Sequence, residues 1–156
     1  MSPIISPTTV GNLKSAAVAH KKPIKIDKRL YDTIFAEVGG GAPEEVAAVA
    51  SVFLNTAREK GYEAALKRSS AYNKRSDQFK KASFGQLNPY EAKIYVRNQS
   101  IIDNLAQNPV AIAPFTHFEN VKAFGEPYWA KNQPFTDIGR QRFYTIDDVP
   151  LKGPKE

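Results

Sequence analysis

Three consecutive glycines, Gly39 to Gly41, separate two segments that each carry the apolar spacing of a helix. Glycine accepts left-handed backbone angles, so a run of this kind ends a helix and turns the chain sharply. The helix before the glycines is expected to begin after Asp27, a good N-cap. Its buried stripe follows the spacing i, i+3, i+4 and i+7: Tyr31, Ile34, Phe35 and Val38. Two helices joined by a tight turn are therefore the expected centre of the fold.

The helix after the glycines is the clearest in the sequence. Pro43 suits its first turn, and Glu44 and Glu45 complement the positive N-terminal end of the helix dipole. Gly61 marks its end, and a short helix is expected over residues 62–67. The apolar stripe of the long helix comprises Val46, Val49, Ala50, Phe53, Leu54 and Ala57.

The rest of the chain predicts one more long helix and a smaller β-containing part. Residues 68–87 are polar and are expected to form a loop. A third long helix is expected to start at the cap Asn88, because Pro89 follows it and Glu91 completes a capping box. Strand-like segments at 111–118 and 142–146 enclose a loop with aromatic residues. The expected fold class is α+β, mainly helical, with a small β-containing lobe and a groove between the two lobes.

The composition bounds the kind of protein. The 156 residues fit one domain, which is expected over residues 27–150. Residues 1–26 are expected to form a flexible or docking arm, and residues 151–156 a short tail. There is no cysteine, so zinc–sulfur sites are excluded, and two histidines disfavour a multi-histidine site. Carboxylates alone could still hold a hard cation, but no metal or cofactor is expected. The net charge of +6 suits a polyanion such as a bacterial wall, nucleic acid or acidic lipid. No apolar run approaches the roughly 18–20 residues of a membrane helix, and the start of the chain lacks a signal-peptide pattern.

The segment from Ile34 to Thr56, IFAEVGGGAPEEVAAVASVFLNT, resembles the spore-cortex-lytic (SleB-like) cell-wall hydrolases. Their pattern is a helix ending in Ala-Glu, a glycine-containing turn, and an alanine- and valine-rich helix ending in Leu-Asn-Arg. Later pieces follow in the family's order: Gln78-Phe79, Thr116-His117-Phe118, Tyr128-Trp129 and the stretch 138–144. The resemblance spans about residues 28–147. It implies a lysozyme-like core and cleavage of the MurNAc–GlcNAc bond of peptidoglycan, with Glu37 as the catalytic acid.

This chain departs from the family pattern at four positions. The family has an arginine and a second glutamate in the turn, where this chain has Gly39 and Gly41. The arginine after Leu-Asn is Thr56, and the closing histidine is Gln141. These changes affect substrate binding and leave Glu37 in place.

Glu37 also has a physical reason to be a proton donor. It lies seven residues after Leu30 and three after Ile34, at the edge of the apolar stripe, where desolvation disfavours the anion. It also falls in the last turn of its helix, where the negative end of the dipole opposes a carboxylate. A carboxyl group with a raised pKa can protonate the leaving oxygen of a glycosidic bond near neutral pH.

A glycosidase normally uses two carboxylates, and no second one stands out. The candidates each have an ordinary structural explanation: Glu44, Glu45, Asp77 and Glu119. A single glutamate favours the lytic transglycosylase route that the resemblance implies, in which the sugar's own 6-hydroxyl closes a 1,6-anhydro ring. A muramidase is the alternative enzyme.

Several further residues are candidates for sugar binding or for support of the site. Amides, hydroxyls and aromatic faces match a glycan strand, which predicts contacts from Gln78, Phe79, Thr116, His117, Tyr128 and Trp129. Core packing is the alternative for the aromatic pair, and a structural role is the alternative for His117. Gly40 is expected to support the catalytic turn, and Asn55 is expected to hydrogen-bond it.

Three classes of function remain open from the sequence. The first is a wall-cleaving enzyme of a bacteriophage, an endolysin or a virion enzyme, found in the virion or the host cytoplasm before it reaches the wall. The second is a non-catalytic virion protein of the same fold with a wall-binding groove, docked to other virion proteins through the arm. The third, a nucleic-acid-binding module, is disfavoured because the lysines are scattered and no specific nucleic-acid motif is present.

Overall fold

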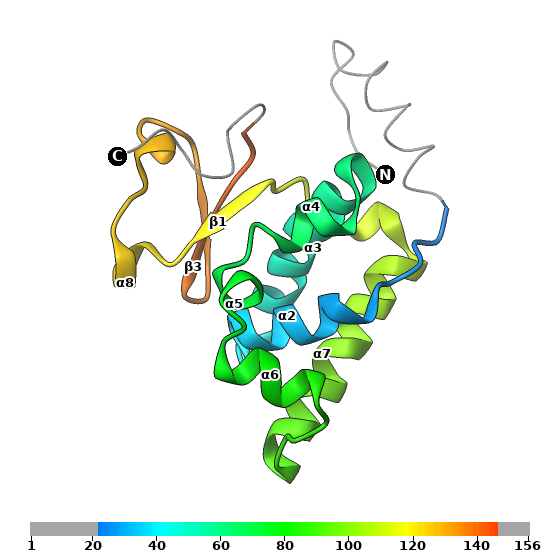
Figure 1. Cartoon of the computed structure of the whole chain (residues 1–156). Helices are drawn as coiled ribbons and strands as arrows, with labels where there is room; N and C mark the ends of the chain where they lie inside the picture. The colour runs from blue at the N-terminus through cyan, green and yellow to red at the C-terminus, as the bar shows by residue number, and fades with distance from the viewer. Residues whose placement is uncertain (1–21, 147–156) are drawn as a thin grey trace.

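A computed structural model describes residues 22–146 and has a helical body with a small sheet at one side (Figure 1). This confirms the expected fold class, α+β and mainly helical. The α-helices are α2 (Lys28–Val38), α3 (Pro43–Lys60), α4 (Tyr62–Leu66), α5 (Ser70–Asn73), α6 (Asp77–Ser83), α7 (Pro89–Gln107) and α8 (Val121–Phe124). The 3-10 helices are η2 (Pro109–Ala111) and η3 (Tyr128–Ala130), and the strands are β1 (His117–Glu119), β2 (Thr136–Ile138) and β3 (Gln141–Tyr144).

The ends of the long helices follow the local signals in the sequence. The Asp27 side chain accepts a hydrogen bond from the backbone N–H of Arg29 and so caps α2. Gly39 ends that helix with a φ of 46°, an angle at which a side chain would be strained. Asn88 and Glu91 form the expected capping box at the start of α7. The three long helices therefore begin where the sequence predicts, and α2 and α3 end at the predicted glycines.

The prediction of a loop over residues 68–87 is wrong, because α5 and α6 lie within it. Ser69 and Ser76 cap these helices by accepting hydrogen bonds from the backbone N–H groups of Tyr72 and Phe79. Phe79, which is 2% exposed, provides the apolar anchor of α6. The segment is polar overall because both helices are short and lie at the surface, so a single buried face needs few apolar residues.

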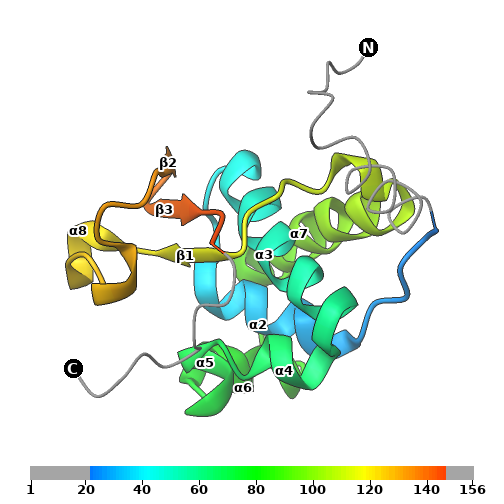
Figure 2. The ribbon, with the colours of Figure 1, turned by 90° about the horizontal axis from the view of Figure 1, so that it is seen from above.

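The core lies around α3, which is surrounded by α2, α4 and α7 (Figure 2). Its largest fully buried side chains come from these helices and from β3, which joins the sheet to the helical body. They include Leu30, Ile34, Val46, Val49, Phe53, Leu54, Leu66, Ile102 and Phe143. The sheet and α8 project to one side of this body (Figure 2).

The sheet is antiparallel, with the strand order β1-β3-β2. Glu119 pairs with Arg142 across β1 and β3, and Ile138 pairs with Gln141 across β2 and β3. Only Gly139 and Arg140 connect the latter strands. Gly139 has a φ of 61°, which suits the first central position of a tight hairpin turn. Strand-like content was predicted for β3 and the end of 111–118, whereas β2 was not predicted.

The start of the described chain lies against the helical body. The backbone N–H of Ile24 donates to the carbonyl of Ala106 over 2.9 Å, and Ile24 and Ile26 pack on the core. The last residues of the expected arm therefore pack on the helical body. The rest of the expected arm and the tail over 151–156 lie outside the described residues. Within residues 22–146, no helix is both long and apolar enough to cross a membrane.

Candidate functional site

Glu37 lies in the last turn of α2 and is partly buried. Its carboxylate oxygen Oε2 accepts a hydrogen bond of 2.5 Å from the hydroxyl of Ser69. Burial raises the pKa of Glu37, and the hydrogen bonds from Ser69 and from the backbone of Ala71 lower it by less. The desolvation expected from the position of Glu37 on its helix is therefore present.

Ser69 connects this carboxyl group to the next element. Its side chain is the N-cap of α5, where the hydroxyl oxygen accepts from the backbone N–H of Tyr72 over 3.1 Å. Ser69 is 2% exposed, so its hydroxyl is held between the helix start and Glu37. Ser69 was not among the residues predicted from the sequence, although a serine before a short helix is a recognisable cap signal.

Glu119, at the end of β1, is a second carboxyl group in the neighbourhood of Glu37. Burial raises the pKa of Glu119, and the negative charge of Glu37 raises it further. Of the other candidates for a second carboxylate, Glu44 and Asp77 are exposed, and Glu45 is buried against a different pocket. Of the four candidates for a second carboxylate, Glu119 is therefore the one whose charge interacts with Glu37, and the pairing of β1 with β3 holds it in place.

Next to Glu119 is a pocket of about 140 Å³. It brings together three of the predicted sugar-binding residues. Thr116 directly precedes β1, His117 is the first residue of β1, and Trp129 lies in η3. The other lining residues are Val52, Phe53, Arg68, Phe118 and Glu119. One pocket thus combines a cation, a carboxyl group and aromatic faces, which are groups able to hydrogen-bond to a polar ligand and to stack on it.

The hydrogen bonds of His117 define its protonation. The guanidinium of Arg68 lies 2.5 Å from Nε2 of His117, and arginine can only donate, so Nε2 accepts. The proton is then on Nδ1, which donates to the hydroxyl oxygen of Thr116 over 2.8 Å. Burial, and then the charges of Arg68 and Lys60, lower the pKa of His117 to about 4. His117 is therefore neutral near pH 7 and lies in the pocket wall.

Arg68 is a pocket residue that the sequence analysis did not select. Besides contacting His117, its guanidinium donates to the hydroxyl of Thr56 over 2.8 Å. Thr56 stands where the family pattern has an arginine, so in this chain an arginine from a different segment approaches that position. No local motif marks Arg68, because its role depends on the packing of α3 against the α4–α5 connection.

The two aromatic candidates in η3 differ in exposure. Trp129 is partly buried, with its ring 4.9 Å from that of His117 and 5.2 Å from that of Tyr144. It therefore both packs on the sheet and lines the pocket. Tyr128 is 39% exposed and lies outside the pocket lining.

Of the predicted Gln78-Phe79 pair, the first residue lies at the surface and the second in the core. Gln78 is exposed in the first turn of α6 and does not line the pocket. Phe79 is buried, with its ring 5.5 Å from that of Tyr72 in an edge-on contact. The prediction that Phe79 contacts substrate is corrected, because its ring is used to anchor α6.

Asn55 does not hydrogen-bond the glutamate turn as expected. Its amide donates to the carbonyls of Ala113 and Phe115, both over 2.8 Å. Asn55 therefore holds the segment that precedes β1. Asn98 of α7 supports the turn instead, by donating to the carbonyl of Gly39 over 2.9 Å. Gly40 lies close to Ile94, whose terminal carbon would be 3.1 Å from a Cβ at that position. Gly40 therefore supports the turn by permitting close packing on α7.

No three His, Asp or Glu side chains within residues 22–146 form a group that could hold a metal ion. The chain matches no family model, no curated protein and no solved structure. The resemblance to the spore-cortex-lytic hydrolases therefore stays a prediction.

Proposed function

We propose that this protein cleaves the MurNAc–GlcNAc bond of peptidoglycan, with Glu37 as the catalytic acid and base. The observation that carries the proposal is the environment of Glu37. Its carboxyl group is desolvated, its pKa is raised, and Ser69 fixes its orientation. A carboxyl group in this state holds a proton at the pH where an exposed glutamate has lost it.

The neighbouring pocket supports a sugar substrate. Arg68 offers N–H donors, and the ring of Trp129 offers a flat apolar surface on which a sugar ring can stack. Neutral His117 is held by Arg68 and Thr116 and so forms a fixed wall. The net charge of +6 adds a general attraction for a wall that carries carboxylates and phosphates.

The route we propose is that of a lytic transglycosylase. Protonated Glu37 donates its proton to the bridging oxygen, and the bond from that oxygen to C1 of the muramic sugar breaks. The 6-hydroxyl of the same sugar then bonds to C1 and gives its proton to the Glu37 carboxylate. The products are a 1,6-anhydro sugar end and a free 4-hydroxyl, and no water is consumed.

A second candidate is hydrolysis, and the observation in its favour is Glu119. A retaining or inverting glycosidase needs a second carboxylate to act as nucleophile or base. Against it, burial favours the protonated form of Glu119, and the negative charge that Glu37 carries after it has given up its proton favours that form further. An uncharged carboxyl group is a poor nucleophile and a poor base, so the transglycosylase route remains the first choice.

A wall-digestion assay with mass spectrometry of the released sugars tests activity and route together. Wild type is expected to release anhydro products, which are lighter than hydrolysis products by one water. Glu37→Gln is expected to lose about 10²–10⁴-fold of the activity or more, because the amide has no proton to donate. Glu59→Gln is the matched control, since Glu59 is exposed. Cleavage by Glu37→Gln within a few-fold of wild type would remove Glu37 from the mechanism.

A further inference from the structure

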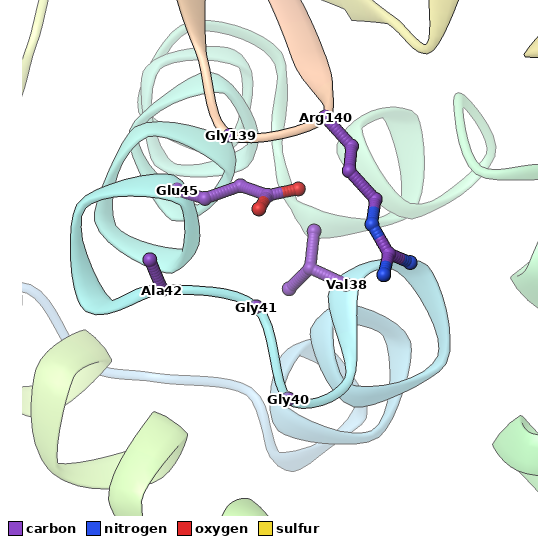
Figure 3. A pocket seen from close by; sticks show the side chains of 7 residues that line it. All are labelled: Val38, Gly40, Gly41, Ala42, Glu45, Gly139 and Arg140. Carbon is purple, nitrogen blue, oxygen red and sulfur yellow. The ribbon is translucent and has the colours of Figure 1, made fainter.

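A second, larger pocket of about 430 Å³ lies between the glycine turn, the start of α3 and the β2–β3 hairpin (Figure 3). It is lined by Val38, Gly40, Gly41, Ala42, Glu45, Gly139 and Arg140. None of these residues lines the pocket that contains His117. It is therefore a separate cavity, formed in part by the glycine turn that follows Glu37.

The side chain of Glu45 points into this pocket (Figure 3). Glu45 is 4% exposed, yet it accepts no hydrogen bond and forms no ion pair with any residue in 22–146. Another buried carboxylate shows the contrast. Asp32 is 2% exposed and is hydrogen-bonded by Lys28, Ser83 and Tyr95. The carboxylate oxygens of Glu45 are not among the enclosed polar atoms that lack a partner, so they face the pocket and are free to accept hydrogen bonds from a bound group.

Two glycines create the space that this carboxylate occupies. A Cβ atom at position 139 would lie 2.2 Å from Oε1 of Glu45, and one at position 41 would lie 2.8 Å from it. A side chain at position 139 would displace the carboxylate of Glu45 from the place that it occupies. The pocket therefore depends on the absence of side chains at Gly41 and Gly139, so both its floor and its wall are backbone.

Arg140 provides the opposite charge. It is exposed in the hairpin turn, and its side chain extends along the other side of the pocket from Glu45 (Figure 3). No ion pair within 4.0 Å joins it to Glu45 or to another residue of the described chain. An anion and a cation thus face one cavity with space between them, which is the arrangement needed to bridge them with a ligand.

We infer that this pocket binds a small zwitterion, an amino-acid head group whose ammonium meets Glu45 and whose carboxylate meets Arg140. The ammonium would supply the donors that Glu45 lacks, and the planar guanidinium matches a carboxylate with two N–H groups. The identity of the ligand rests on the proposed function: in a protein that acts on peptidoglycan, the natural source of such a head group is the stem peptide of the wall. The outer end of diaminopimelate carries both charged groups on one carbon, whereas lysine at the same place carries only the ammonium.

Binding of two soluble stem tripeptides to the full chain tests this inference by titration calorimetry. The probes are Ala-γ-Glu-diaminopimelate and the same peptide with lysine in the third position. The first is expected to bind about 10- to 100-fold more tightly, because the lysine peptide cannot make the charge-assisted bonds to Arg140. Glu45→Gln and Arg140→Gln should each weaken binding of the first peptide by a similar factor. Glu44→Gln is the matched control, since Glu44 is the exposed neighbour in the same helical turn and should bind as wild type.

The inference is overturned if the diaminopimelate peptide does not bind at millimolar concentration, or binds equally well to both charge variants. It is also overturned if Arg140 folds onto Glu45 in the free protein, which a crystal structure would show as an ion pair. Should Glu45→Gln melt early, Arg140→Gln still tests the site, because the Arg140 side chain is exposed. The peptides contain no glycosidic bond. If the protein binds the peptides and leaves walls intact, the proposed function is refuted and the binding site is supported. If it cleaves walls and does not bind the peptides, the binding site is refuted and the proposed function is supported.

Discussion

The hydroxyl of Ser69 donates a 2.5 Å hydrogen bond to the carboxylate of Glu37, and the same oxygen caps α5. One side chain thus has two separable effects. It stabilises the start of a short helix, and it stabilises the ionised form of the proposed catalytic group. Because burial acts on the pKa of Glu37 in the opposite direction and more strongly, the hydrogen bond moderates a raised pKa.

Ser69→Ala is expected to raise the pKa of Glu37 further. The proposed reaction needs Glu37 protonated, so the alkaline limb of the pH profile of kcat/KM should move to higher pH. The variant should also lose about 1 kcal/mol of stability with its helix cap.

Ser76→Ala is the matched control, because Ser76 caps α6 in the same way and the hydroxyl is not bonded to Glu37. It should lose similar stability with an unchanged pH profile. Equal pH profiles for the two alanine variants would contradict the assignment of Ser69.

Glu37→Gln should stabilise the protein at neutral pH. The folded chain raises the pKa of Glu37 above its ordinary value of 4.5. Between pH 4.5 and the pKa of Glu37 in the folded chain, the unfolded chain has therefore released a proton that the folded chain keeps. Wild type therefore loses stability as the pH rises above 4.5, and the glutamine variant is spared this loss. Urea unfolding at pH 4 and pH 8 should show equal stabilities at the lower pH and a higher midpoint for the variant at pH 8. A variant that is less stable at pH 8 would show that the ionised carboxylate is favourable where it lies.

His117 should impose a pH dependence in the opposite direction. The folded chain lowers its pKa from 6.5 to about 4, so as the pH falls below 6.5 the unfolded chain binds a proton that the folded chain excludes. Stability should drop between pH 6.5 and pH 4, by at most about 3 kcal/mol for this group. His117→Gln should remove that part of the drop, since glutamine does not titrate and its carbonyl can still accept from Arg68.

Nitrogen NMR of the His117 ring provides an independent measurement of the same property. Across pH 6 to 8 the ring should stay neutral, with the proton on Nδ1 and an unprotonated Nε2 facing Arg68. A titration midpoint near 6.5 would contradict both the burial of the ring and its contact with Arg68.

Local signals were sufficient to predict the long helices, since a cap or a glycine acts through the residues beside it. Asp27, Asn88 and Gly61 are examples, because each terminates or begins its helix through its own backbone or side chain. The same kind of signal was present at Ser69 and Ser76. The polar composition of residues 68–87 nevertheless favoured the prediction of a loop, because α5 and α6 bury only a small face and need few apolar residues.

The candidate site was only partly predictable, for a related reason. The desolvation of Glu37 follows from its position on one helix, so the sequence was enough. The approach of Glu119 depends on the register of β1 with β3, and that of Arg68 depends on how α4 packs on α3. These are tertiary relationships with no local pattern. Asn55 is another example, since it was expected to hydrogen-bond the turn after Glu37 and instead donates to the carbonyls of Ala113 and Phe115.

Glu119→Gln distinguishes the two routes of bond cleavage. If Glu119 is protonated at the working pH, as burial and the charge of Glu37 favour, the amide replaces one uncharged group with another. Activity should then stay within about 10-fold of wild type, well short of the 10²–10⁴-fold typical for loss of an acid–base group. The products should still carry 1,6-anhydro ends.

The control for this variant is Glu126→Gln, an exposed glutamate in the loop before η3, which should leave both rate and products unchanged. Hydrolysis predicts a different pair of results. Wild type would then release hydrated reducing ends, and Glu119→Gln would lose at least as much activity as Glu37→Gln, because a retaining or inverting mechanism needs both carboxyl groups. Since the mass difference of one water is measured on the product itself, the wild-type digest alone decides the route, and the variant then assigns the role of Glu119 within it.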